Sequence, residues 1–458
     1  MSPQTRWALV LGVLVVLAVF GPTVAADYVY DDHLLIRLNY ETTTLAQPWR
    51  FFGQGLWAGT PTFAPPGMYY RPLMALSVAV DRALFGLVPG PAHLHSLLWH
   101  MLGTGALLGL LHRLELPAMA SVAGALVFAL HPAQVEPVVF LSARNDLMAG
   151  ALVLGGVALL LGAPGARVSR RGLVLGGLCL LAAGLSKESA LLAPVVLLVL
   201  SVVVRRRAPQ GGALGIALGA VGSVVLMRAL AGVGTPPNAG LARVLAAAPD
   251  ALLWWCRVVV WPVDLVPGMA LLWPPARPWW ALVVVVVFVG VLVRSGGRRA
   301  LGGLALSALT LAPALPAVAH TGLVPDRYLY LPMAGLGIAV AAALAPLTPR
   351  MVALFAGGLG LVLALLSATT VPRWQDDTAL WTATLARMPT PHVAASFAKV
   401  LELEGDLDQA AEWYGRALVA PIPARHACWN IARVHLLIGD PLSAARMGEQ
   451  ALTVGCPL

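Results

Sequence analysis

Two adjacent aspartates follow the first apolar segment of the chain, in the string Tyr30-Asp31-Asp32. Neighbouring carboxylates repel each other, which can raise the pKa of one of them into the range of a general base. The same pair can instead share a divalent cation. Taken alone, the two residues are more typical of a solvated acidic turn, so their type and spacing leave the function open.

Single basic residues stand at the ends of otherwise apolar segments. Arg71 comes just before Pro72, a residue suited to the first turn of a helix, and Arg327 heads the string Asp326-Arg327-Tyr328-Leu329-Tyr330. A guanidinium at such a point can bind a lipid phosphate, or it can anchor the chain at the membrane surface beside the tyrosines. Hydrocarbon penalises each central charge by about 2.5–3.5 kcal/mol, so these residues need a partner or a function.

Two further groups combine acids with bases. Glu136 and Arg144 lie eight residues apart, and a helix over 133–144 would place them on similar faces. We therefore expect an ion pair between them. Lys187-Glu188, at the junction of two apolar segments, is interpreted in the same way, as an internal ion pair.

Three polar residues share one helical face at positions i, i+3 and i+7: His93, Ser96 and His100. Histidines at this spacing can bind a metal, but packing histidines at the entrance of a span are commoner. We interpret the two histidines as packing residues that can also line a substrate site.

Composition decides what kind of protein must position these groups. Of the 458 residues, 59% are hydrophobic and 11% are charged, and the mean hydropathy is +0.81. Soluble proteins carry roughly 25% charged residues, so the composition excludes a soluble protein and indicates a polytopic helical membrane protein. The net charge of +9 comes from short arginine clusters between apolar runs, which is typical of membrane topology and not of nucleic-acid binding.

Eleven apolar runs are candidate membrane spans, which predicts an all-α fold. They cover 7–24, 94–111, 118–130, 147–162, 172–186, 190–204, 211–230, 279–293, 300–319, 329–345 and 351–370. Val24-Ala25-Ala26 resembles a signal-peptidase site, but we expect the first span to be retained. Acids are almost confined to one set of connections, which predicts a cytoplasmic N-terminus and an external C-terminus. Two long outer loops, 25–92 and 231–278, join the spans.

The sequence pattern changes after the predicted transmembrane domain, 1–370, from apolar runs to a repeat. Gly405-Asp406 recurs as Gly439-Asp440, and Ala410 recurs as Ala444, each time 34 residues later. This interval is the period of tetratricopeptide (TPR) repeats. The sequence therefore predicts a small external α-hairpin domain over 371–458, with repeats at 391–424 and 425–458 and a packing cap at 374–388.

Taken together, these strings resemble the TMTC-like protein O-mannosyltransferases, GT-C membrane glycosyltransferases with C-terminal TPR repeats. The strings that match, in order along the chain, are Tyr30-Asp31-Asp32, Tyr70-Arg71-Pro72-Leu73, His93 with His100, His131-Pro132 with Glu136 and Arg144-Asn145-Asp146, Lys187-Glu188, and Asp326-Arg327-Tyr328-Leu329-Tyr330-Leu331-Pro332. Ser96 stands where asparagine would be expected, and only two repeats follow. The resemblance implies a polyprenyl-phosphate sugar donor, commonly of mannose, used outside the cytosol. It also implies an acid of the first outer loop at the catalytic centre, here Asp31 or Asp32.

The sequence thus predicts an inverting glycosyltransferase that moves a mannose or another hexose to an external hydroxyl, on protein Ser/Thr or a glycan. Asp31 or Asp32 would be catalytic, with a divalent cation possible at the pair but no certain cofactor. The predicted substrate and lipid-phosphate site comprises Arg71, His93, His100, Glu136, Arg144, Lys187, Glu188, Arg327 and Tyr328. A transporter and a non-catalytic membrane scaffold are the alternatives. Basic residues are nearly all arginine, as in a GC-rich bacterium, which suggests a bacterial inner membrane.

Overall fold

The computed structural model describes residues 3–60, 69–234, 240–265, 269–270, 279–419 and 427–453. The chain divides into two compact units. The first comprises Met1–Asp27 and Asp31–Val371, and the second comprises Tyr28–Tyr30 and Pro372–Leu458. The predicted boundary after residue 370 left out the short stretch Tyr28–Tyr30, which lies with the C-terminal helices.

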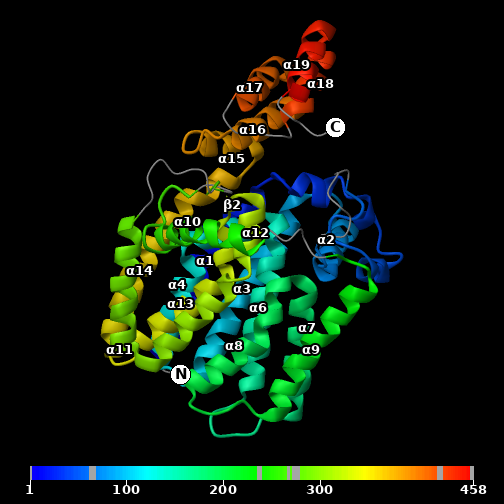
Figure 1. Cartoon of the computed structure of the whole chain (residues 1–458). Helices are drawn as coiled ribbons and strands as arrows, with labels where there is room; N and C mark the ends of the chain where they lie inside the picture. The colour runs from blue at the N-terminus through cyan, green and yellow to red at the C-terminus, as the bar shows by residue number, and fades with distance from the viewer. Residues whose placement is uncertain are drawn as a thin grey trace. The chain divides into compact units, whose positions relative to one another are not determined.

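The first unit is a bundle of helices (Figure 1). Short 3₁₀ segments and a two-residue antiparallel pair, β1 (Met269–Ala270) with β2 (Leu323–Val324), join them. The helices are α1 (Pro3–Phe20), α2 (Pro72–Phe85), α3 (Pro89–Arg113), α4 (Ala118–Leu130), α5 (Val135–Val139), α6 (Arg144–Leu161), α7 (Arg170–Ser186), α8 (Ala193–Val199), α9 (Gly211–Leu230), α10 (Leu241–Val260), α11 (Trp279–Leu311), α12 (Ala314–Thr321), α13 (Tyr330–Leu344) and α14 (Pro349–Thr370).

Fewer helices qualify as membrane spans than the sequence predicted. Among the described residues, seven helices are long and apolar enough to cross a membrane, or eight if the bent pair Ala118–Leu130 and Pro132–Val139 is one span. The run at 190–204 forms a shorter apolar helix, Glu188–Val204. The runs at 279–293 and 300–319 merge in one long segment that is kinked at Gly297 (φ 55°). The chain is an integral multi-pass membrane protein, but eleven spans are not shown.

The centre of the bundle contains α4, α6 and α13, whose side chains are almost all buried. Glycines let these helices approach closely. A Cβ atom on Gly124 of α4 would lie 2.2 Å from the backbone oxygen of Gly337 on α13. Close crossings of this kind are typical of membrane helices, where van der Waals contact replaces the hydrophobic driving force.

The second unit consists of helices α15 (Asp377–Leu385), α16 (Pro391–Glu404), α17 (Leu407–Val419), α18 (Ala427–Ile438) and α19 (Pro441–Thr453). Gly405 (φ 88°) and Gly439 (φ 86°) take the left-handed conformation at the turns of two successive hairpins, α16–α17 and α18–α19. Small residues such as Ala398, Ala410 and Ala417 pack around the buried Tyr414. The hairpins fall within 391–424 and 425–458, and their assignment as TPR repeats stays a prediction.

Tyr30 is bound to the first helix of this unit. Its backbone N–H donates to Oδ1 of Asp377 (2.9 Å), and its ring meets the ring of Trp381 edge to face at 5.2 Å between centroids. Tyr30 has φ 52°, a left-handed conformation that non-glycine residues seldom adopt. The residue just before Asp31 therefore has a strained backbone that is held by contacts within its own unit.

Candidate active site

Three ion pairs lie near one another at one end of the first unit. Arg327 pairs with Glu136, Lys187 pairs with Asp146, and Arg71 binds Glu188 through Nε (3.0 Å) and Nη2 (2.9 Å). The charges of Arg71 and Arg327 both act on Lys187, so the three cations form one cluster. We call Arg71, Lys187 and Arg327 the basic cluster.

Interruptions of the helices bring these residues together. α4 ends at the string His131-Pro132, and the helix that follows is bent by 55° from it, which places Glu136 beside the segment that precedes α13. Glu136 Oε2 accepts hydrogen bonds from the backbone N–H groups of Asp326 (2.8 Å) and Arg327 (3.3 Å). Glu136 thus binds the backbone and the guanidinium of the same turn, and fixes the position of Arg327.

The members of the basic cluster keep some donors for another ligand. Their side chains are 14% (Arg71), 10% (Lys187) and 23% (Arg327) exposed, so none is sealed within the bundle. Among the residues that the structure describes, Arg71 Nη1 and Arg327 Nε and Nη2 make no hydrogen bond, and they are not among the buried unpaired atoms. These donors are therefore accessible, and they suit the oxygens of a phosphate.

Aromatic rings line the same cluster. Tyr328 lies beneath two of the cations, with its ring centroid 5.1 Å from Lys187 Nζ and 5.5 Å from Arg327 Cζ. The ring of Tyr69 lies 4.6 Å from the guanidinium carbon of Arg71. Such cation–π contacts hold a cation in place without using its hydrogen-bond donors.

The two adjacent aspartates have different environments. Asp32 is fully buried, and its Oδ1 accepts hydrogen bonds from the backbone N–H (2.7 Å) and the hydroxyl (2.6 Å) of Ser142. Asp31 is partly buried, and no described residue forms a hydrogen bond or ion pair with its carboxylate. Burial raises the pKa of Asp31 to about 6, against the opposing charge of Arg327. A carboxyl group with this pKa exchanges protons near neutral pH.

Arg144 occupies a different place from the one predicted. The expected ion pair with Glu136 is wrong, because Arg144 pairs with Asp81 of α2 at 2.6 Å while Glu136 pairs with Arg327. Phe140 is extended (ψ 107°), so the predicted helix over 133–144 is broken and its two ends do not share a face.

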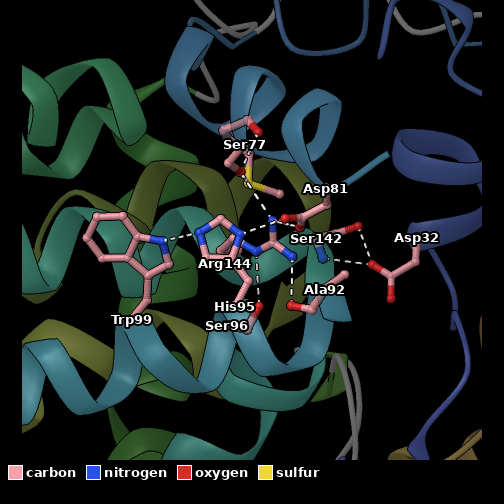
Figure 2. A network of polar contacts seen from close by, with 10 residues as sticks. Asp32, Ser77, Asp81, Ala92, His95, Ser96, Trp99, Ser142 and Arg144 are labelled. Atoms are coloured by element: carbon pink, nitrogen blue, oxygen red, sulfur yellow. Dashed lines mark hydrogen bonds and ion pairs between the residues drawn. The ribbon is translucent and has the colours of Figure 1, made fainter. Parts of the chain in front are cut away.

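Figure 2 shows how fully Arg144 is bound. Its guanidinium also donates to Ser96 Oγ (3.1 Å), Ser77 Oγ (3.3 Å) and the carbonyl of Ala92 (2.8 Å), and the side chain has no exposed surface. The other oxygen of Asp81 binds Nδ1 of His95 (2.8 Å). Arg144 is therefore a structural residue that joins α2 and α3 to α6, and it has no accessible donor for a substrate.

The two predicted site histidines are packed inside the bundle. His93 Nε2 lies 3.4 Å from the carbonyl oxygen of Asp27, and His100 Nε2 lies 3.0 Å from that of Ala129. The ring of His100 packs against aromatic residues that include Tyr330. In the part of the chain that the structure describes, no group of three or more His, Cys, Asp or Glu residues is arranged to hold a metal ion. The possible divalent cation at the aspartate pair therefore gains no support.

No protein-family model matches the chain. Several curated proteins are similar to part of the chain. Protein O-mannosyl-transferase TMTC2 of Mus musculus is 31% identical over 139 residues, which is 30% of this chain and 16% of that protein. Tmtc1 of Drosophila melanogaster is 34% identical over 128 residues, or 27% of this chain and 15% of that protein. The chain is a distant relative of the TMTC protein O-mannosyl-transferases. The resemblance seen in the sequence is confirmed to this extent.

The similarity covers less than two thirds of the length of these TMTC proteins. Solved structures are more remote. ArnT from Cupriavidus metallidurans bound to undecaprenyl phosphate has a TM-score of 0.46 and 16% identity, over 98% of this chain and 75% of that chain. An Archaeoglobus fulgidus oligosaccharyltransferase has a TM-score of 0.37 and 13% identity, over 84% of this chain and 58% of that chain.

Two residues that bind predicted site residues were not themselves predicted. Ser142 binds Asp32, and Asp81 pairs with Arg144. Neither has a sequence signal of its own, because a serine or an aspartate next to an apolar run has many possible partners. Asp146, by contrast, lay within the predicted string Arg144-Asn145-Asp146, and it is the partner of Lys187.

Proposed function

We propose that the chain is a GT-C-type inverting glycosyltransferase. It transfers a sugar, mannose or another hexose, from a polyprenyl-phosphate donor to a hydroxyl group of a protein Ser/Thr or a glycan. The observation that carries this proposal is the position of Asp31, a carboxyl group with a pKa of about 6, within the electrostatic field of Arg327. This position supports a site that combines a proton acceptor with a cation for the phosphate.

Asp31 acts as the general base. It takes the proton of the acceptor hydroxyl as that oxygen forms a bond to the anomeric carbon, and the bond between this carbon and the phosphate oxygen breaks. The polyprenyl phosphate leaves with the electron pair of the broken bond. Attack from the face opposite the phosphate inverts the anomeric centre. Asp32 is unsuited to this step because its Oδ1 is committed to Ser142.

The basic cluster binds the departing phosphate. Negative charge on the phosphate grows as the sugar bond breaks, so Arg71, Lys187 and Arg327 stabilise the transition state more than the bound donor. Each cation is already held by its acid, Glu188, Asp146 or Glu136, and is therefore oriented before the donor arrives. This role extends to Tyr328, whose ring supports Lys187 and Arg327.

The proposal includes a bacterial inner membrane as the location, with the site and the C-terminal unit on the external side. The C-terminal hairpins would then present an acceptor protein or glycan. The concentration of acids on one set of connections supports this orientation.

Transfer of labelled sugar from polyprenyl-phosphate donors, measured in membranes that contain the full chain, tests the function. Asp31→Asn is expected to lower transfer by about 10²–10⁴-fold, the usual contribution of a general base. Glu41→Gln is a control in the same loop, since Glu41 pairs with Arg50 and forms no ion pair with Arg71, Lys187 or Arg327. Transfer at the wild-type level by Asp31→Asn would refute the proposed base and favour a non-catalytic scaffold or a transporter.

A further inference from the structure

A second concentration of positive charge lies away from the candidate active site. A cavity of about 370 Å³ is lined by Arg205, Arg206, Arg298 and Arg299, together with the single acid Glu115. We call these four arginines the arginine pocket. Arg71, Lys187 and Arg327 are not among the residues that line this cavity.

Three segments that are far apart in the sequence form this cavity. Leu114 and Glu115 follow α3, Arg205 and Arg206 follow the helix that ends at Val204, and Gly296 to Arg299 surround the kink in α11. Apolar helices end or break at all three places. The cavity therefore lies at the level where hydrocarbon gives way to lipid headgroups.

The backbone around the cavity is strained. Glu115 (φ 58°) and Arg206 (φ 54°), which line the cavity, are two of the four non-glycine residues with positive φ in the described chain, and Gly297 (φ 55°) lies between the lining residues Gly296 and Arg298. Such conformations are strained and concentrate at ligand clamps. Arginine clusters that orient a membrane protein would explain the positive charge of the cavity. They would not explain the left-handed backbone conformations beside it.

The four arginines keep hydrogen-bond donors that do not bind any described residue. Arg205 donates to the carbonyl of Leu161, and Arg298 Nε donates to that of Val203 (3.3 Å). The side chains of Arg206 and Arg299 have no hydrogen-bond or ion-pair partner among the described residues, and none of the four arginines forms an ion pair with Glu115 there. Arg113 and Arg207 also lie within electrostatic range of Arg205 and add positive charge.

We infer that the arginine pocket binds the phosphodiester headgroup of an anionic phospholipid. Guanidinium groups match phosphate oxygens through paired hydrogen bonds, and four of them opposite one carboxylate favour an anion. Basic pockets between membrane helices are suited to lipid phosphates. The apolar side chains of Leu114 and Val204 in the same wall can contact the glycerol and the first acyl carbons. The inference stands apart from the proposed transferase activity.

Native mass spectrometry of the full chain, in micelles of phosphatidylcholine with increasing phosphatidylglycerol, tests the pocket. The double variant Arg206→Gln with Arg299→Gln is expected to lower the affinity for phosphatidylglycerol roughly 30-fold, from about 1 kcal/mol per arginine. The matched control is Arg167→Gln with Arg170→Gln, which removes two exposed arginines at the start of α7 and just before it, outside the pocket. The control should change the affinity less than about threefold.

Three results would overturn the inference: equal loss of affinity in the pocket and control variants, no preference for phosphatidylglycerol over phosphatidylcholine, or equally strong binding of soluble glycerophosphoglycerol. The last result would identify a free phosphodiester as the ligand in place of a lipid. The double variant Arg206→Lys with Arg299→Lys covers the case in which the glutamine variant does not fold. It keeps the charge but loses the paired hydrogen bonds, so an intermediate loss of affinity is expected.

Discussion

Removing the charge of Asp31 is expected to stabilise the protein at neutral pH. Burial raises the pKa of this carboxyl from its ordinary value of 3.8 to about 6, so the native state prefers the neutral form. The cost of ionisation is absent below the unfolded pKa and is complete above the folded one. At 1.36 kcal/mol per pKa unit the difference amounts to about 3 kcal/mol. This value is an upper limit, because Asp31 is partly exposed and solvent screens its charge.

Substitution of the neighbouring residue, Asp32→Asn, should have the opposite effect and lower the free energy of unfolding. Asp32 is fully buried, and its carboxylate accepts two hydrogen bonds from Ser142. Hydrogen bonds to charged groups contribute about 1.5–3 kcal/mol and those to neutral groups about 1 kcal/mol, so Asp32→Asn, which keeps the acceptor oxygen but loses the charge, is expected to lower the free energy of unfolding by about 1–2 kcal/mol. Two adjacent aspartates therefore serve as controls for each other.

Thermal unfolding of the full chain in detergent, at about pH 7.5 and about pH 4.5, measures both effects. Asp31→Asn should unfold at a higher temperature than the wild type at the higher pH. Its gain should shrink from about 3 to about 1 kcal/mol at the lower pH, where the native wild-type carboxyl is already mostly protonated. A gain that is equal at both pH values would refute the raised pKa. The same sign for both variants would refute the division of roles between the two aspartates.

Three more outcomes are expected. Sugar transfer should fall as the pH drops below about 6, because Asp31 becomes protonated. Arg327→Gln should move this pH limit upward, since the Arg327 charge lowers the pKa of Asp31. A pH–rate profile in which the limit does not move would contradict this assignment. Arg144→Gln should destabilise the chain by about 3–5 kcal/mol in thermal unfolding, because it leaves a buried carboxylate without its cation. Gly124→Ala should cost about 1–3 kcal/mol, since the added methyl group would lie 2.2 Å from the backbone oxygen of Gly337; unchanged stability would show that α4 and α13 are less closely packed.

The cluster of ionisable groups could be predicted from the sequence, but their pairing could not. Lys187 and Glu188 were expected to form an internal ion pair, and each does pair inside the bundle. Lys187 has an extended backbone (φ −157°, ψ 141°), in which successive side chains point in opposite directions. The two residues therefore bind separate partners, Asp146 and Arg71, which lie 41 and 117 residues away.

The predicted pair between Glu136 and Arg144 shows why periodicity failed here. The pair required an unbroken helix, but α5 ends at Val139 and α6 begins at Arg144. Pro132 and Pro137 were the signals of short, interrupted helices in this stretch. The positions of the helices themselves were easier to predict, because long apolar runs specify membrane helices without reference to the rest of the fold.

The stretch Tyr28–Tyr30 has a practical consequence for shortened chains. A protein that ends at Val371 would keep its transmembrane helices, but Tyr30 would lose both the Asp377 acceptor and the Trp381 ring, one peptide bond ahead of Asp31. Inactivity of such a truncation would not reveal whether α16–α19 recognise an acceptor. Exchanging the chain from Pro391 onward, with α15 intact, would retain the tether and so separate recognition from catalysis.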